Sequence, residues 1–226
     1  MTALLAMLLA GCSNDGSYEV QGTVVVYSYW TFSFGQVNDT LPGADPATFQ
    51  SVKHWLGHDN ERVYFENRLV PVADIASLQP DRYPLFHDKD DYYYEATPLH
   101  VADVASFKTI KWFGDDFWAV DSRFAYYDST RIDGADVTSF ELLDFSVARD
   151  KNSVYFFGKV IPDADPATFE QIGNSAYFRD KAHIWCGKDL LVDADRATFV
   201  VDDIDRAHDK HGAFRFEMRD TAAVEE

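Results

Sequence analysis

Basic residues are scarce in this sequence: its 226 residues include 20 Lys and Arg against 38 Asp and Glu, a net charge of -18. This surplus of acids opposes the counterion release that drives nucleic-acid binding, so no nucleic-acid partner is expected. The sequence also lacks a hydrolase elbow, a phosphate-binding glycine loop and a paired Cys and His nucleophile. It does contain 46% hydrophobic and 15% aromatic residues, which is enough to bury a core.

One apolar run stands out, the uncharged stretch from Met1 to Gly11, which is too short to span a bilayer. Polar residues follow it at once, as after the core of a signal peptide, although no Lys or Arg precedes it. The run ends in Leu9-Ala10-Gly11-Cys12, which resembles the lipobox of bacterial lipoproteins. This resemblance implies cleavage before Cys12 and a lipid on its thiol, and Ser13 after it resembles a signal for the outer membrane.

Cysteine is nearly absent, because Cys186 is the only one besides Cys12. No intramolecular disulfide is available once Cys12 carries a lipid, so stability must come from packing. Cys186 has no second thiol and no catalytic surroundings in the sequence. We interpret it as a small apolar residue of a strand.

The chain repeats itself about every 30 residues. Two anchors recur in step, and 19 residues separate each of the first five Asp anchors from the next apolar anchor. All length variation falls between the apolar anchor and the next Asp, which is typical of a folded unit joined by surface loops. The apolar anchors are Phe49, Leu78, Phe107, Phe140, Phe169 and Phe199, and the Asp anchors are Asp59, Asp88, Asp121, Asp150, Asp180 and Asp209.

Each apolar anchor ends an Ala-Asp-x-x-Ser/Thr-Phe motif or a variant of it, as in Ala164 to Phe169. With Asp as the N-cap of a short helical turn, Pro falls at N1 and Ser or Thr at N3. Ala and Phe are then the two ends of a hydrophobic staple that drives the Phe into the core. The predicted caps are Asp45, Asp74, Asp103, Asp136, Asp165 and Asp195.

Paired aromatic residues follow most Asp anchors, as in Tyr64-Phe65 and Tyr155-Phe156, and such runs favour strands. Neighbouring residues of a strand point to opposite faces, so one ring of each pair should enter the core and the other could form a surface stripe. We therefore predict an all-β array of three-stranded antiparallel units with short helical turns, as a stack or continuous sheet. A closed propeller-like ring is the alternative.

The segment Asp150-Lys151-Asn152-Ser153-Val154-Tyr155-Phe156 resembles the signature of the DKNYY family of bacterial repeat proteins. Similar segments begin at Asp88 and Asp180, whereas Asn60 and Ser122 replace the Lys in two weaker units. The resemblance covers about residues 55 to 216. It implies a location in the cell envelope and no particular activity.

Two metal hypotheses compete with structural roles. Calcium prefers several converging carboxylates, and the best clusters are Asp163/Asp165, Asp193/Asp195 and Asp202/Asp203/Asp205, but only two of six repeats carry the Asp two residues before the cap. His54 and His58 have a zinc-like spacing but no expected helix. We predict neither a metal nor another cofactor.

The longest loop of the array, Lys111 to Trp118, carries unusual apolar bulk. These side chains are first expected to fold under the array, and if part of the array makes contacts, we predict the candidate contact surface there. The residues are Trp112, Phe113, Phe117 and Trp118.

The predicted organisation is a lipoprotein signal peptide at residues 1–11, a tether at 12–21, a repeat domain at 22–218 and a disordered tail at 219–226. The expected function is that of a non-enzymatic envelope lipoprotein, anchored to the membrane through Cys12. It would bind an unidentified envelope protein or glycan. The alternative is an envelope glycan hydrolase, which requires two carboxylates outside the repeat pattern in one cleft.

Overall fold

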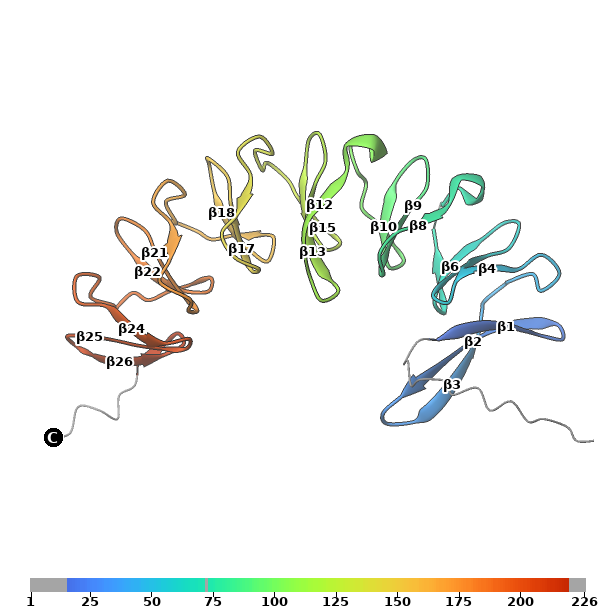
Figure 1. Ribbon diagram of the computed structural model, residues 1–226, viewed down its shortest axis with the longest axis horizontal. Helices are drawn as coiled ribbons and strands as arrows, with labels where there is room; N and C mark the ends of the chain where they lie inside the picture. The colour runs from blue at the N-terminus through green and yellow to red at the C-terminus, as the bar shows by residue number, and fades with distance from the viewer. Residues whose placement is uncertain (1–15, 72, 220–226) are drawn as a thin grey trace, which may run out of the picture. The chain divides into compact units, whose positions relative to one another are not determined.

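The computed structural model describes residues 16–71 and 73–219, and Figure 1 shows that these residues form a series of small β-sheets. The chain divides into two compact units, residues 1–100 and 101–226. Each described sheet is antiparallel, its strands are hydrogen-bonded in a linear order, and none is closed on itself. The prediction of an all-β repeat protein is confirmed.

The first unit contains three sheets. A three-stranded sheet comes first, and two four-stranded sheets follow, separated by the 3-10 turn η1 (Ile75–Ser77). Their strands are β1 (Ser17–Gln21), β2 (Val24–Thr31) and β3 (Gly35–Thr40); β4 (Gln50–Lys53), β5 (Leu56–His58), β6 (Val63–Phe65) and β7 (Arg68–Val70); and β8 (Gln79–Pro80), β9 (Leu85–His87), β10 (Tyr92–Tyr94) and β11 (Thr97–Pro98).

The second unit begins with the 3-10 turn η2 (Val104–Ser106) and contains four sheets of four strands each. Their strands are β12 (Lys108–Phe113), β13 (Asp116–Val120), β14 (Ala125–Tyr127) and β15 (Thr130–Ile132); β16 (Glu141–Leu142), β17 (Val147–Arg149), β18 (Val154–Phe156) and β19 (Lys159–Val160); β20 (Glu170–Gln171), β21 (Tyr177–Arg179), β22 (Ile184–Cys186) and β23 (Asp189–Leu190); and β24 (Val200–Asp203), β25 (Arg206–Asp209), β26 (Gly212–Arg215) and β27 (Met218–Arg219).

Six repeats therefore contain four strands where three were predicted, and the strands form separate sheets instead of one continuous sheet. The added strand directly follows the apolar anchor and pairs with the strand that leads to the Asp anchor, as β20 pairs with β21. It is as short as two residues, too short to show a period of two in the sequence.

The β-structure also extends beyond both ends of the predicted repeat domain, residues 22–218. Ser17–Gln21, predicted to be part of a tether, form β1 and pair with β2. At the other end, Arg219 belongs to β27 and forms an ion pair with Asp209 at 2.9 Å. Residues 1–15, which include the predicted signal peptide and Cys12, and the tail residues 220–226 lie outside the described residues.

Within each unit the core lies between successive sheets, so a sheet with a neighbour on each side is covered on both faces. In the first unit, Tyr64 packs with Tyr27 and Leu41 on one side of β6, while Phe65 packs with Phe86 on the other. Both rings of this pair are fully buried. The predicted alternation of faces holds, but the second ring enters the next core layer, so no surface stripe of rings forms here.

Candidate functional site

The six Asp anchors are not exposed turn residues: their side chains are only 0–6% exposed. In the repeat around Asp150, Oδ1 accepts the backbone N–H groups of Asn152 and Ser153, at 2.6 and 2.8 Å. Oδ2 accepts the N–H of Asp136 at 2.6 Å and the hydroxyl of Tyr155 at 2.8 Å. We call this arrangement the aspartate node. It joins the turn after the Asp to the helical turn before it and to a core tyrosine.

The predicted caps lie beside these nodes. Asp136 Oδ1 accepts the N–H of Ser139 at 3.0 Å, as an N-cap does, and the Ser139 hydroxyl accepts the N–H of Lys151 at 3.0 Å. The Lys151 ammonium completes the arrangement with an ion pair to Asp136 at 2.6 Å. The other predicted caps also accept hydrogen bonds from their own turns, namely Asp45, Asp74, Asp103, Asp165 and Asp195.

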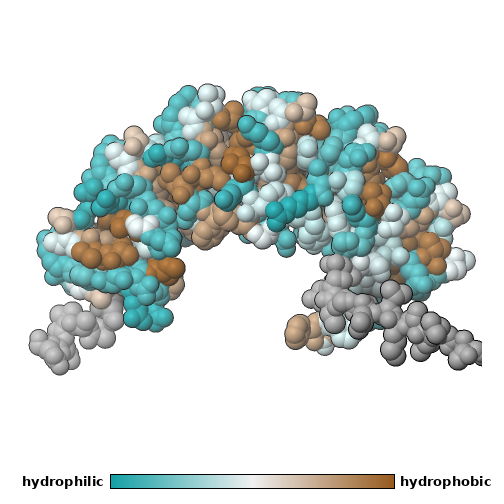
Figure 2. Space-filling model, in the orientation of Figure 1, coloured by the Kyte–Doolittle hydropathy of each residue, from teal (hydrophilic) through white to brown (hydrophobic). Residues whose placement is uncertain are grey.

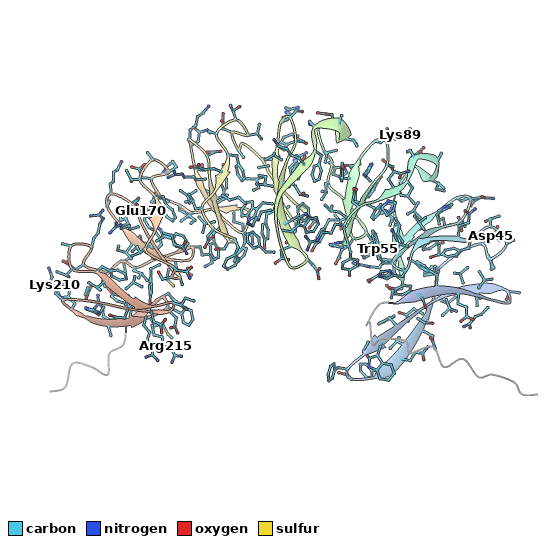
Figure 3. The ribbon with its side chains drawn as sticks, viewed as in Figure 1. Asp45, Trp55, Lys89, Glu170, Lys210 and Arg215 are labelled. Carbon is cyan, nitrogen blue, oxygen red and sulfur yellow. The ribbon has the colours of Figure 1, made fainter. Side chains whose placement is uncertain are left out.

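This geometry explains the residues of the signature. The Asp is buried in the node, the Lys binds the cap, and the next residue gives its backbone N–H to the Asp. The same pairing joins Lys89 to Asp74, Lys181 to Asp165 and Lys210 to Asp195. In a repeat without the Lys, the Ser122 hydroxyl donates to Asp103 at 2.6 Å instead. Figure 3 shows Lys210 and Arg215 at opposite ends of the last sheet.

Hydrogen bonding favours the ionised form of five of the six Asp anchors. Burial raises the pKa of Asp88 and Asp121, but the backbone N–H and tyrosine donors outweigh it, and the pKa of each lies below the usual range. The pKa values of Asp59 and Asp180 are lowered in the same way. The pKa of Asp209 is also lowered, chiefly by the hydrogen bonds that Arg219 donates to it. The recurrent Asp residues are therefore structural groups.

The metal candidates have other partners. Among the residues that the structure describes, no group of three His, Cys, Asp or Glu side chains could hold a metal ion. Asp165 binds Lys181, and His208 Nδ1 lies 2.8 Å from Asp202. Cys186 is buried in the core, and burial raises the pKa of its thiol to about 11.

The predicted contact surface is largely internal. Residues Lys111 to Trp118 form a hairpin between β12 and β13, not a loop. Phe117 and Trp118 are fully buried, and Trp118 Nε1 donates to the carbonyl of Phe145 at 2.9 Å. Trp112 and Phe113 are half-buried against Phe117 and Phe145, respectively. Phe117 and Trp118 therefore cannot form an exposed contact surface. Trp118 packs in the core with Ala148 and Tyr155 of the next sheet, and Phe117, on the opposite face of the strand, is also fully buried.

A pocket of about 470 Å³ opens elsewhere in the second unit, at one end of its last three sheets. Phe145, Phe156, Phe157, Phe178, Ile204 and Phe216 provide most of its apolar lining. Phe145, Ile204 and Phe216 are 54%, 59% and 43% exposed, so the lining is open to solvent. We call it the phenylalanine pocket. Figure 2 shows patches of hydrophobic surface among the hydrophilic surface of this unit.

The pocket depends on one position of the repeat, the residue directly after the third strand, which we call the hairpin tip. It has a positive φ in all six repeats. Its residues are Glu66, Glu95, Asp128, Phe157, Gly187 and Phe216. In the second unit, Gly187 has no side chain between the two phenylalanine tips, and a Cβ there would lie 3.1 Å from the Phe156 ring. Space therefore opens between Phe157 and Phe216.

This site was missed by reasoning from the sequence, although a signal for it exists. Acidic tips are compatible with solvent, whereas a bulky apolar residue at a φ of 46° or 52° is unusual and strained. Phe157 and Phe216 break the acidic pattern of the earlier tips. Departures from a structural repeat are the positions where function is expected.

Comparison with known proteins agrees with the repeat. Residues 118–222 match the model of the DKNYY family, which is consistent with a repeat protein of that family. The match lies within the second unit, although the aspartate nodes at Asp59 and Asp88 belong to the first. No curated protein and no solved structure matches the chain. None of the helices within residues 16–71 and 73–219 is long and apolar enough to cross a membrane.

Proposed function

We propose that this DKNYY repeat protein is a lipid-anchored protein of the bacterial cell envelope that binds an apolar segment of a partner protein without catalysis. The observation that supports this best is the phenylalanine pocket, where Phe157 and Phe216 replace acidic hairpin tips. Its volume of about 470 Å³ suits one or two apolar side chains. The Leu9-Ala10-Gly11-Cys12 sequence supports the anchor.

A protein segment fits this pocket better than a glycan. Exposed phenylalanines such as Phe145 and Phe216 gain by leaving water, whereas a sugar needs several hydrogen-bonding groups that hold its hydroxyls. The polar groups at the rim include Asp144, but its Oδ1 accepts the N–H groups of Ser146 and Val147, both at 2.7 Å. The Asp144 carboxylate therefore holds its own loop in place. This supports a binding role for the pocket over a hydrolytic one.

The anchor is tested by replacing its cysteine. Cys12→Ser should abolish incorporation of labelled palmitate and move the protein from the membrane fraction to the soluble fraction, because the thiol that carries the lipid is removed. Cys186→Ser is the matched control, since that thiol is buried in the core. A membrane fraction unchanged in Cys12→Ser would refute the anchor.

The pocket is tested by photo-crosslinking in intact cells. A benzoylphenylalanine at position 216 should give one discrete adduct with an envelope protein. The same group at Val192, which is 78% exposed in the same unit but outside the pocket, should give none. In the protein that carries the crosslinker at position 216, the further substitution Phe157→Asp should reduce the yield of the adduct about tenfold. Binding would then have to desolvate a charge in the apolar site. Equal adducts at 192 and 216 would contradict the proposal.

A further inference from the structure

The first unit contains a second pocket, of about 560 Å³, with a different chemistry. Its walls are mostly aromatic, and Tyr27, Tyr29, Trp55 and Tyr83 all line it. Glu66, a hairpin tip, adds a carboxylate to the same space. We call this site the aromatic-acid pocket. Figure 3 shows Trp55 at the end of its sheet opposite to Asp45, so the pocket lies away from the caps.

Neighbouring sheets of the first unit supply these residues. Tyr27 and Tyr29 are two apart on β2 and therefore point to the same face, with ring centroids 5.8 Å apart. Trp55 lies in the turn between β4 and β5, and Tyr83 lies between β8 and β9. The rings of Trp55 and Tyr83 meet at 79°, with centroids 5.6 Å apart. Tyr27 and Trp55 are each 3% exposed, so Tyr29 and Tyr83 present most of the ring surface to the space.

The charge of the pocket is negative. The described residues that line it include Glu66 and His54 but no Lys or Arg. The Tyr83 hydroxyl donates to Glu66 Oε1 at 3.2 Å and so holds the carboxylate at the wall beside the rings. Arg68, two residues further along, is paired with Glu95 at 2.9 Å. Burial raises the pKa of Glu66, so a bound cation would stabilise its charged form.

Aromatic faces and a carboxylate are the groups that bind an organic cation, because the negative ring faces attract a positive charge that carries only a weak hydration shell. We propose that the aromatic-acid pocket binds a small organic ammonium ion of the trimethylammonium type. Its tyrosine and tryptophan rings surround the methyl groups, and Glu66 supplies the counter-charge. This site is independent of the phenylalanine pocket and of the lipid anchor.

The proposal is tested by isothermal titration calorimetry of the full chain, purified in a polyoxyethylene detergent, with choline chloride at constant ionic strength. We expect saturable binding with a Kd on the order of 1 mM or tighter. The neutral isostere 3,3-dimethylbutan-1-ol should bind about tenfold more weakly. Glycerophosphocholine forms a second arm: equal binding would indicate that a phospholipid headgroup can occupy the site, and weaker binding that only the free cation fits.

Variants locate the binding. Glu66→Gln and Tyr83→Leu should each weaken choline binding about tenfold, and either variant suffices if the other does not fold. Asp128→Asn is the matched control, because it removes an acid from the same tip position in the other unit and should leave the Kd unchanged. Absence of saturable heat, equal binding of the neutral isostere, or unchanged affinity in both variants would overturn the proposal. So would binding of N-acetylglucosamine at this pocket in place of choline.

Discussion

Replacing Asp150 by alanine should lower the free energy of unfolding of the second unit by about 3–5 kcal/mol. The Asp150 side chain is 3% exposed and accepts four hydrogen bonds, from three backbone N–H groups and the Tyr155 hydroxyl. Alanine leaves these donors without their acceptor next to the core, and an unsatisfied buried donor costs about 1–3 kcal/mol. Water that reaches the turn accepts some of these donors and so recovers part of the lost free energy.

The measurement is urea denaturation followed by far-UV circular dichroism and tryptophan fluorescence. Lys151→Ala is the matched control at the next position, because it removes only the solvent-exposed ion pair with Asp136 and should cost about 1 kcal/mol or less. Asp150→Asn should fall between them, since the amide oxygen still accepts two N–H groups. If Asp150→Ala unfolds at the same urea concentration as Lys151→Ala, the node does not stabilise the repeat.

The second large effect is a cooperative loss of structure in acid. The pKa values of Asp59, Asp88, Asp121, Asp180 and Asp209 are lowered in the folded protein. A lowered pKa in the folded state contributes stability that is present above the unfolded value of about 3.9, and that is lost as the pH falls through the folded value. We therefore expect stability to decline below about pH 4 in both units, because these five residues are divided between them.

Asp88→Asn separates this linkage from general charge repulsion. At pH 7 the variant should be about 1–3 kcal/mol less stable than the parent, because the amide nitrogen cannot accept from the Asp74 N–H or the Tyr93 hydroxyl. In acid the parent also loses its carboxylate, so the difference between the two proteins should shrink. Urea midpoints at pH 7, 4 and 3 measure it. A constant difference at all three pH values would show that Asp88 does not titrate on unfolding.

The two pockets show how a structural repeat can carry different functions. The hairpin tip has a similar backbone conformation in every repeat, with a φ of 46–57°, but its side chain differs. Glu66 contributes to a negatively charged aromatic pocket, whereas Phe157 and Phe216 form an apolar one. The node and the cap hold each sheet in place, while the side chain at the tip differs from repeat to repeat.

The phenylalanine pocket could not be predicted from the sequence because its residues are far apart in the chain. Phe145 and Phe216 line one pocket only because three successive sheets place the ends of their hairpins side by side. The same reasoning explains the error at Phe117 and Trp118. Their apolar character predicts either a core or a contact surface, and only the packing of the folded chain around them decides that they are core.

The sequence by itself determined the features that depend on neighbouring residues. The repeat of about 30 residues, the turns that begin at residues such as Asp136 and the strands around Tyr155 follow from local hydrogen bonds and propensity. Only the tertiary structure decided that Asp150 is buried, that each repeat gains a fourth strand and which hairpin tips form a pocket. The pocket depends on contacts between sheets, whose partners lie a whole repeat away in the chain. The burial of Asp150 depends on how its own repeat closes around it, and the fourth strand is too short to leave a pattern in the sequence.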